Sequence, residues 1–270
     1  MSGQPQPRRV RGRVAGRERV SVSMHRMTLD LDEAVRFLPG QFCMLNFEGA
    51  REMVLSRPFS ILRVDGRRLD LLFKVVGAGT RLMADCRPGD AAVCLAPLGR
   101  PFPPPAGDLP HLLLAGGVGL PPLWAWRRRW GRDADLNLFG GRDGADVPWD
   151  LLDDGWACSV DRPVDVPPGR EAHAGTVVDL AGMLLDGETR PRRVLACGPA
   201  PLLRAAAELA RGRGWDCFVS VEERMGCGYG VCRGCVVPRA DGGGYLTACQ
   251  DGPVFASTQV DLAPGGEGDA

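Results

Sequence analysis

The stretch HLLLAGGVGLPPLWAWRRRW, residues 111–130, decides the fold of the central part of the chain. It begins with a short apolar run followed by glycines, which is typical of a buried strand that ends in a tight turn. The segment after the turn is predicted to be a helix that holds two prolines at its start. No charged residue lies between Leu109 and Trp126, which raises the question of a membrane span. The glycines and prolines within it favour a strand, a turn and a helix instead.

The same alternation of strand and helix continues toward the C-terminus. The predicted strands are DLNLFGG (135–141), WACSVD (156–161), RRVLACG (192–198) and CFVSVE (217–222), and the predicted helices are TVVDLAGMLL (176–185) and APLLRAAAELARGRG (200–214). Alternating strands and helices indicate crossover units, and they therefore predict a doubly wound parallel sheet.

The first hundred residues have a different pattern of short strands separated by turns. The predicted strands lie in RGRVAGRERVSVSMHRMTLDL (11–31), QFCMLNF (41–47), SILRV (60–64) and RRLDLLFKVV (67–76). Asp65-Gly66 joins the last two runs and is a typical hairpin turn. Strands at this spacing predict a small antiparallel barrel. The proline-rich segment from Pro97 to Pro110 is predicted to be a stiff linker.

The chain of 270 residues is long enough for more than one domain with its own core. We expect a multi-domain β plus α/β protein. Its domains would be an antiparallel β-barrel over residues 1–104, a nucleotide-binding α/β domain over 105–218 and a small cysteine-rich domain over 219–270. The formal net charge is zero, which argues against a nucleic-acid partner and against electrostatic membrane binding. The basic N-terminus leads into no apolar segment, so we expect no signal peptide and a cytoplasmic protein.

Four of the ten cysteines form a constellation in the C-terminal part. RMGCGYGVCRGCVV, residues 224–237, holds Cys227, Cys232 and Cys235, and thirteen residues separate Cys235 from Cys249. The spacing C-x4-C-x2-C…C is the plant-type pattern of a 2Fe-2S cluster. The glycines within the run would let the loop wrap closely and turn its N–H groups toward sulfur. Structural zinc and disulfides are the alternatives, although zinc more often uses paired C-x2-C or mixed Cys/His ligands, and no histidine lies in this region.

The remaining cysteines are scattered singly in apolar runs. They are Cys43, Cys86, Cys94, Cys158, Cys197 and Cys217. Lone cysteines of this kind usually behave as small buried hydrophobes, and without a secretory signal a disulfide framework is not expected.

Two motifs in the barrel region suit a phosphate-bearing ligand. In RPFS, residues 57–60, Arg57 could fork onto a pyrophosphate and Ser60 could bond a ring nitrogen, provided that the proline bends the strand. In KVVGAGT, residues 74–80, the glycines open a loop and Thr80 is a candidate N-cap of a short helix, whose free N–H groups would form an anion site. A surface Arg–Ser pair and an ordinary strand-to-helix turn are the simpler interpretations of these motifs.

Two turns of the parallel sheet suit a nicotinamide nucleotide. Gly116, Gly117 and Gly119 follow a predicted strand and open a helix, where glycines permit close approach of a phosphate, although the full G-x-G-x-x-G spacing is absent. Cys197 and Gly198 end another strand at the same carboxyl edge, where ligands of such sheets bind. A small buried residue at a strand end is an equally good interpretation of Cys197. Gly141-Arg142-Asp143 offers an acid for a ribose diol and an arginine for a 2′-phosphate, so the preference between NAD and NADP stays open.

RPFS, GAGT, AGGVGLPPL, ACGPAPLL and the C-terminal cysteines, in this order, resemble the ferredoxin–NADP reductase superfamily. EERMGCGYGVCRGCVV followed by CQDGPVF is similar to the electron-transfer subunits of class 1B dihydroorotate dehydrogenase, and the match runs from about residue 10 to residue 256. The resemblance implies FAD, NAD and a 2Fe-2S cluster as cofactors. It implies FAD contacts at Arg57, Pro58, Phe59, Ser60, Leu72, Phe73, Lys74, Gly79 and Thr80, and iron ligands at Cys227, Cys232, Cys235 and Cys249.

The resemblance also implies an activity and a partner. A separate FMN-containing dihydroorotate dehydrogenase subunit would pass electrons through the cluster and FAD to NAD⁺ in pyrimidine biosynthesis, in a heterotetramer of two plus two. We assign no catalytic residue, because none of the three histidines lies in a catalytic motif. The alternatives are a related flavin and iron–sulfur subunit, of the ferredoxin:NADP oxidoreductase or sulfide dehydrogenase type, and a zinc-stabilised interaction module.

Overall fold

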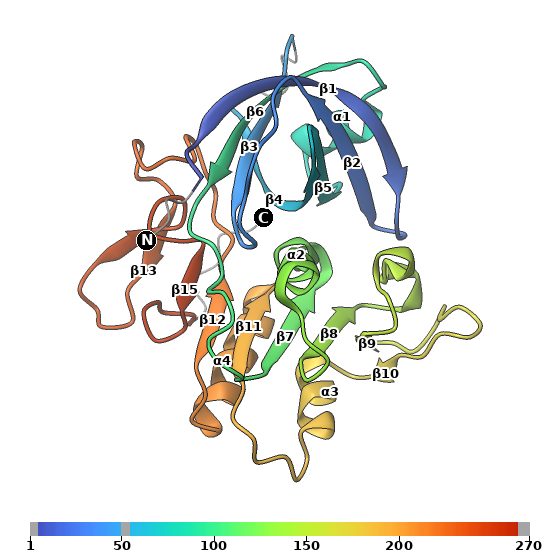
Figure 1. The fold of residues 1–270 in the computed structure, drawn as a ribbon, viewed down its shortest axis with the longest axis vertical. Helices are drawn as coiled ribbons and strands as arrows, with labels where there is room; N and C mark the ends of the chain where they lie inside the picture. Colours follow the sequence, from blue (N-terminus) through green and yellow to red (C-terminus); the bar gives the residue numbers. More distant parts are fainter. Residues whose placement is uncertain (1–4, 50–54, 264–270) are drawn as a thin grey trace.

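The computed structural model describes residues 5–49 and 55–263, which form three parts. A β-barrel built from the N-terminal strands lies above an α/β sheet, and the C-terminal segment packs beside both (Figure 1). The predicted fold class is confirmed by this arrangement. None of the helices within the described residues is long and apolar enough to cross a bilayer.

The barrel is closed and antiparallel, in the strand order β1-β2-β5-β4-β3-β6. Its strands are β1 (Arg8–Arg19), β2 (Met24–Leu31), β3 (Phe42–Phe47), β4 (Arg57–Asp65), β5 (Arg68–Lys74) and β6 (Ala91–Leu98), with helix α1 (Ala78–Asp85) between the last two. The predicted Asp65-Gly66 hairpin is confirmed: it joins β4 to β5, and Gly66 has the positive φ of +60° that such a turn requires.

Side chains alternate between the inside and the outside of the barrel along β3. Cys43 and Leu45 belong to the apolar core within the barrel. Phe42 and Met44, on the other face of the strand, belong to the apolar cluster shared with the α/β sheet and the C-terminal segment. Because strand side chains have a period of two, one strand contributes to both cores.

The sheet has the order β10-β9-β8-β7-β11-β12-β15, and all of its pairs are parallel except that of β12 with β15. Its elements are β7 (His111–Gly116), α2 (Leu120–Trp130), β8 (Leu136–Gly141), β9 (Trp156–Val160), β10 (His173–Ala174), α3 (Val177–Leu184), β11 (Arg193–Cys197), α4 (Ala200–Gly212) and β12 (Cys217–Ser220). Every strand and helix predicted in this region is therefore present, and the uncharged segment 109–126 is divided between β7 and α2.

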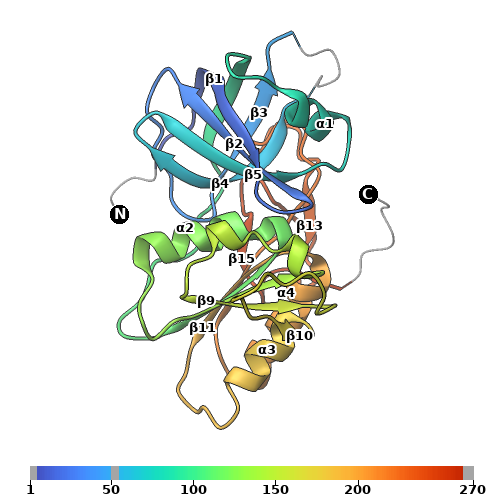
Figure 2. The same ribbon diagram turned by 90° about the vertical axis from the view of Figure 1, so that its right-hand side faces the viewer.

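Helices cover both faces of the sheet. Helix α2 packs on one face and also on strand β4 of the barrel, so it lies between the two parts (Figure 2). Leu113 and Ala115 of β7 meet this helix in one apolar cluster, whereas Leu112 and Leu114 meet α3 and α4 in another. The continuous apolar run of β7 follows from this burial on both faces.

The predicted linker 97–110 forms no helix or strand beyond Arg100, but it is packed against the sheet. Phe102 is completely buried, and the indole N–H of Trp126 donates to the carbonyl of Pro103 at 2.9 Å. The linker therefore helps to hold the barrel against α2.

The C-terminal segment contains the short strands β13 (Val236–Pro238), β14 (Tyr245–Thr247) and β15 (Val254–Ala256). The first two pair with each other, and β15 is the edge strand of the large sheet, beside β12. The boundary expected after residue 218 lies within β12, and the last strand of the segment is shared with the α/β sheet.

Candidate redox site

The four predicted metal ligands lie close together in the C-terminal segment. Cys227 and Cys232 lie in the loop between β12 and β13, Cys235 directly precedes β13, and Cys249 lies in the turn that follows β14. Cys235 and Cys249 are buried, with 1% and 3% of their surface exposed, whereas Cys232 is exposed. No disulfide joins any of the ten cysteines, all of which lie within the described residues.

The four thiols are arranged as two pairs. The N–H of Cys232 donates to the sulfur of Cys227, and the N–H of Cys249 donates to the sulfur of Cys235, each at 3.4 Å. Two pairs of thiols fit a cluster of two irons, in which each iron takes two protein ligands. Nowhere in residues 5–49 and 55–263 do three His, Cys, Asp or Glu side chains gather around one metal-sized position.

The surroundings shift the pKa values of Cys227, in one pair, and Cys249, in the other, in opposite directions. Burial raises the pKa of Cys227, but backbone N–H groups of Cys232, Tyr229 and Val231 oppose it and bring that pKa down to about 6. Burial and the neighbouring thiol of Cys235 raise the pKa of Cys249. Since the thiolate is the form that binds metal, the lowered pKa favours Cys227 over Cys249 as a metal-binding thiolate at neutral pH.

The loop between β12 and β13, residues 221–235, is called the cysteine loop below. Two of its glycines have backbone conformations that other residues rarely adopt. Gly228 has a φ of +82° and Gly230 a φ of +89°. The N–H of Gly230 donates to the sulfur of Cys249 at 3.2 Å, which is the role expected of these glycines. Gly226 and Gly234 have no positive φ but pass close to Cys232: a Cβ at either position would lie 3.5 Å and 3.7 Å, respectively, from its sulfur.

The RPFS motif forms the first residues of strand β4, and all four of its side chains are half-buried. The bend expected at Pro58 is wrong, because β4 pairs with β3 without interruption from Arg57, opposite Leu45, to Ser60, opposite Phe42. Arg57 and Ser60 therefore point to opposite sides of the strand. Their partial exposure leaves room for a ligand along this end of the barrel.

Lys74, at the end of β5, connects the barrel to the sheet. Its ammonium lies 3.5 Å from a carboxylate oxygen of Asp146, and a Cβ at Gly117 would lie 3.3 Å from the same nitrogen. Leu72 and Phe73, which precede it on the strand, are buried, with 3% and 2% exposure. Lys74 thus stands between the predicted flavin motif and the predicted nicotinamide turn.

Asp146 is a functional candidate that the sequence did not reveal. Only 2% of its side chain is exposed, and it accepts from the hydroxyl of Ser23, from Lys74 and from Arg142. Burial raises its pKa, but these partners outweigh that effect and hold the pKa below its usual value. Ser23 and Lys74 come from the barrel, so this carboxylate joins the two parts. No local pattern marks it as a junction, because Ser23 and Lys74 are distant in the chain.

The sequence suggested Thr80 as the N-cap of a short helix, but the structure places another residue there. Helix α1 begins at Ala78 with Gly77 as its N-cap, so Thr80 is the third helical residue. Its hydroxyl accepts from the N–H groups of Val76 and Gly77, at 2.9 Å and 3.0 Å, and so it caps the turn from inside the helix. Gly79 is buried in the same turn. The extended conformation of Gly77 explains the shift, since an N-cap residue has a non-helical backbone.

The glycines at the carboxyl edge of the sheet bring two turns into contact. A Cβ at Gly119 would overlap the carbonyl of Cys197 and lie 2.6 Å from the nitrogen of Gly198. A Cβ at Gly116 would lie 2.7 Å from a methyl group of Leu202, on α4. The structure therefore brings the predicted nicotinamide residues together and gives Gly116 and Gly119 a packing role.

The start of α2 has few hydrogen-bond donors for a phosphate. Pro121 and Pro122 have no N–H group, and the N–H of Leu120 donates to the carbonyl of Gly117. A phosphate at the start of this helix would therefore meet few free N–H groups in the first turn. The helix dipole and the positive charge of Lys74 are the attractions that remain there.

The residues considered for nucleotide preference are engaged within the protein. Arg142 pairs with Asp146, and Asp143 accepts from Arg162 at 2.8 Å and caps the short helix Gly144–Asp146. Cys197 is buried, and burial raises its pKa, so its thiol is uncharged at neutral pH. This environment agrees with the interpretation of Cys197 as a small buried residue at a strand end.

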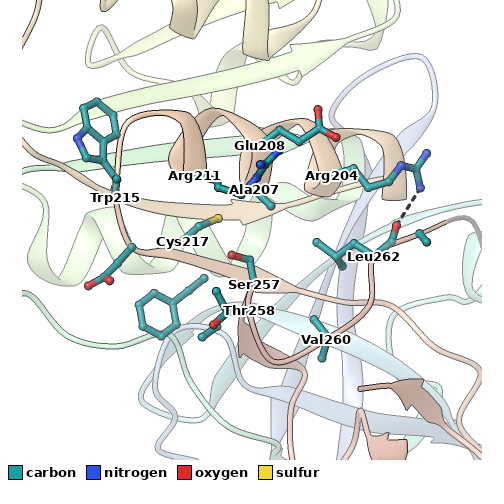
Figure 3. A pocket seen from close by; sticks show the side chains of 15 residues that line it. Arg204, Ala207, Glu208, Arg211, Trp215, Cys217, Ser257, Thr258, Val260 and Leu262 are labelled. Atoms are coloured by element: carbon teal, nitrogen blue, oxygen red, sulfur yellow. Dashed lines mark hydrogen bonds between the residues drawn. The ribbon is translucent and has the colours of Figure 1, made fainter. Parts of the chain in front are cut away.

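Two cavities lie outside the predicted flavin site. One, of about 390 Å³, lies between the β1–β2 turn and the loops that follow β8 and β9, next to Gly144 and Trp149. The other, of about 660 Å³, lies between α4 and the β12–β15 edge and includes Trp215 and Ser257 (Figure 3). Arg204 closes one end of it by donating to the carbonyl of Leu262. No predicted cofactor residue lines either cavity.

Known proteins resemble this chain over most of its length. Residues 222–261 match the family described as the iron-sulfur cluster binding domain of dihydroorotate dehydrogenase B. The chain is 34% identical over 266 residues to the electron transfer subunit of dihydroorotate dehydrogenase B (NAD(+)) from Bacillus caldolyticus, a match that covers 92% of this chain and 99% of that one. It is 32% identical over 232 residues to the probable equivalent from Methanopyrus kandleri, covering 85% and 83%.

Solved structures share the fold at lower identity. A structure of NADH-dependent reduced ferredoxin-NADP oxidoreductase superposes with a TM-score of 0.75 at 22% identity, covering 97% of this chain and 92% of the other. A ferredoxin NADP+ reductase from Neisseria gonorrhoeae superposes with a TM-score of 0.59 at 14% identity, covering 76% and 92%. At these identities the likeness is one of fold.

Proposed function

Because the chain belongs to the family of the electron transfer subunits of dihydroorotate dehydrogenase B, we propose that it carries electrons from a dihydroorotate-oxidising partner subunit to NAD⁺. Its cofactors are FAD, a 2Fe-2S cluster and NAD. The observation that carries the proposal is that one barrel is flanked by all three predicted sites. Strand β4 bears RPFS, Lys74 reaches the turn at Gly117, and the paired cysteines pack against β3.

We assign the three domains that the sequence suggested, residues 1–104, 105–218 and 219–270. Strand β15 is shared between the last two, because it pairs with β12 of the α/β sheet. The metal ligands are Cys227, Cys232, Cys235 and Cys249. FAD contacts are Arg57, Pro58, Phe59, Ser60, Leu72, Phe73, Lys74, Gly79 and Thr80, and nicotinamide contacts are Gly116, Gly117, Gly119, Cys197 and Gly198. When bound, the cluster exchanges single electrons and FAD exchanges hydride with the nicotinamide.

The protein side of the mechanism is positioning and charge. Arg57 offers a guanidinium that can pair with a phosphate group through two parallel hydrogen bonds. Lys74 brings positive charge between the two nucleotide sites, and Asp146 holds it there. The fully buried His111–Asp135 pair lies at the amino end of β7, away from these sites, so it is not available to a substrate. Oxidation of a carbon substrate is therefore assigned to the partner.

The partner in this proposal is an FMN-containing dihydroorotate dehydrogenase subunit, in a heterotetramer of two plus two. The cysteine loop offers a docking surface for it, because several apolar side chains near the cysteines are exposed. Val231 is 73% exposed, Tyr245 69% and Tyr229 55%. An apolar patch beside a redox centre is suited to a protein that must bring a second redox centre close.

Reconstitution tests the proposal. The isolated chain should contain FAD and about two irons and two acid-labile sulfides, oxidise NADH with artificial acceptors, and leave dihydroorotate unchanged. Addition of the FMN-containing subunit should create dihydroorotate-dependent reduction of NAD⁺. Dihydroorotate oxidation by the isolated chain would contradict the proposal, and a colourless protein with stoichiometric zinc would support the interaction module instead.

A second function is kept because of the fold similarity over 97% of the chain to the NADH-dependent reduced ferredoxin-NADP oxidoreductase structure. The same assay distinguishes it. Reduction of NADP⁺ by reduced ferredoxin, with no response to the dihydroorotate dehydrogenase subunit, would favour this alternative.

A further inference from the structure

The cysteine loop touches the barrel at one closely packed point. Gly228, which is buried and has a φ of +82°, lies directly on the side chain of Met44. A Cβ at Gly228 would overlap the Cγ of Met44 and lie 2.7 Å from its sulfur, and the three atoms nearest to that position all belong to Met44. At Gly228 the loop is therefore packed directly against this side chain of β3.

Met44 also stands next to the flavin motif and in contact with the cysteine core. In the β3–β4 ladder it is the direct partner of Pro58, the second residue of RPFS. Its side chain, only 2% exposed, belongs to the same apolar cluster as Cys235 and Cys249. Met44 thus contacts the loop that bears the proposed metal ligands and pairs with the strand that bears the flavin motif.

The loop has little regular structure of its own to fix this separation. Residues 221–235 form no helix or strand. The position of such a loop is set by the side chains beneath it, and an unbranched methionine fills an irregular gap well. Shortening the side chain would open a cavity between β3 and Gly228, into which the loop could shift.

We propose that Met44 is a positioning residue that sets the distance between the iron–sulfur cluster and the flavin, and thereby the rate of electron transfer between them. The proposal rests on the function proposed above. Electron tunnelling slows exponentially with distance, so a small displacement of the loop has a large effect on the rate. The side chain carries no charge and does not act on NADH, so NADH oxidation with artificial acceptors does not depend on it.

The test compares Met44→Ala with Met44→Leu and with Leu98→Ala in the flavin- and cluster-loaded protein. Leu98 is a matched control: it is 3% exposed, lies on the outside of β6 in the same apolar cluster, and is not among the atoms that meet Gly228. Rapid mixing with NADH separates bleaching of the flavin from the later reduction of the cluster, which freeze-quench EPR follows. The EPR line shape and the midpoint potential of the cluster are recorded as well.

In Met44→Ala we expect flavin bleaching at the wild-type rate and cluster reduction slowed severalfold, because the cavity lets the loop shift away from the barrel. Met44→Leu, which conserves volume, should restore the rate. Leu98→Ala should lose stability but keep the rate. An unchanged rate in Met44→Ala, or an equal slowing in Leu98→Ala, overturns the proposal.

If the Met44→Ala protein does not retain iron, Met44→Val is used to test the proposal, because this substitution removes only part of the side chain. Slower cluster reduction at full iron content supports the proposal, and a wild-type rate refutes it. Absence of flavin or cluster from the wild-type protein would instead refute the proposed function. The two failures are therefore distinguishable.

Discussion

The barrel and the cysteine loop are held in their conformations by different means. The barrel is closed by six strands around its own apolar core, in which Leu45, Ile61 and Leu71 are completely buried. The loop region 221–253 has two strands of three residues each, and its buried apolar side chains share a cluster with the barrel and the sheet.

The difference indicates which part depends on a cofactor. A closed barrel satisfies its backbone hydrogen bonds and buries its core without a ligand. A glycine-rich loop with few regular hydrogen bonds loses much conformational entropy on ordering, and a bound metal centre offsets that loss. We therefore expect the loss of the cluster to be a local event and the loss of barrel packing to be a global one.

The largest expected effect is that of Cys232→Ser. This change should remove the cluster and abolish dihydroorotate-dependent NAD⁺ reduction in the complex, because one of the four proposed ligands is lost. FAD content and NADH oxidation with artificial acceptors should remain, since the flavin motif lies on the barrel. Iron analysis, flavin absorbance and both assays measure this. Cys86→Ser is the control: burial raises the pKa of that lone thiol to about 11, and it should leave all four readings unchanged.

The next effect concerns the junction of barrel and sheet. Asp146→Asn should lower the free energy of unfolding by about 3 kcal/mol near neutral pH, since it leaves Lys74 without its carboxylate, and Arg142 is too exposed to add much. The folded pKa of Asp146 lies below its unfolded value. Its contribution is therefore present above about pH 4 and lost as the pH falls through the folded pKa.

Denaturant unfolding of the FAD-saturated proteins over a pH series measures this difference. The difference in the free energy of unfolding between wild type and Asp146→Asn should become smaller as the pH falls. A gap that stays constant down to acid pH would show that the carboxylate contributes by packing alone.

A smaller effect is expected for Arg57→Ala, which removes the proposed charged contact between the barrel and the flavin. It should weaken FAD binding by roughly 1.5–3 kcal/mol, the range for a hydrogen bond to a charged group. Flavin retained on gel filtration and the dissociation constant from fluorescence titration measure it. Arg68→Ala, on the exposed Arg68–Asp30 pair of the same barrel, should bind FAD as the wild type does. If the Arg57→Ala and Arg68→Ala variants bound FAD with equal affinity, Arg57 would not be a flavin contact.

The smallest effect on stability is expected for Val231→Ser in the cysteine loop. Because 73% of Val231 is exposed, the free energy of unfolding should change by no more than about 0.5 kcal/mol. The affinity of the Val231→Ser variant for the FMN-containing subunit should fall. The control is Val164→Ser, at a site of 50% exposure in the α/β part, which should bind the subunit as the wild type does. Titration of one subunit with the other by calorimetry tests this, and equal affinities would place the docking surface elsewhere.

Residues close together in the chain were the best predicted part of this protein. The crossover units, the barrel strands β1 to β5 and the Asp65-Gly66 hairpin follow from local periodicity and turn chemistry, and all of them are present, whereas β6 was not predicted. The expected bend at Pro58 and the N-cap role of Thr80 were wrong. Pro58 lies in the β3–β4 ladder, whose pairing joins segments that are separate in the chain. The N-cap of α1 lies three residues before Thr80, at Gly77, so in this case a helix boundary was misplaced locally.

By itself, the sequence determined the types of the elements and singled out the four cysteines that we propose as cluster ligands, because hydrophobic period and cysteine spacing are local properties. Only the tertiary structure decided that β15 completes the sheet beside β12, that Asp146 joins Ser23 to Lys74, and that Met44 lies beneath Gly228. Each of these contacts joins residues far apart in the chain. Their energies come from shared burial and paired charge, which exist only once the barrel, the sheet and the cysteine loop have packed together.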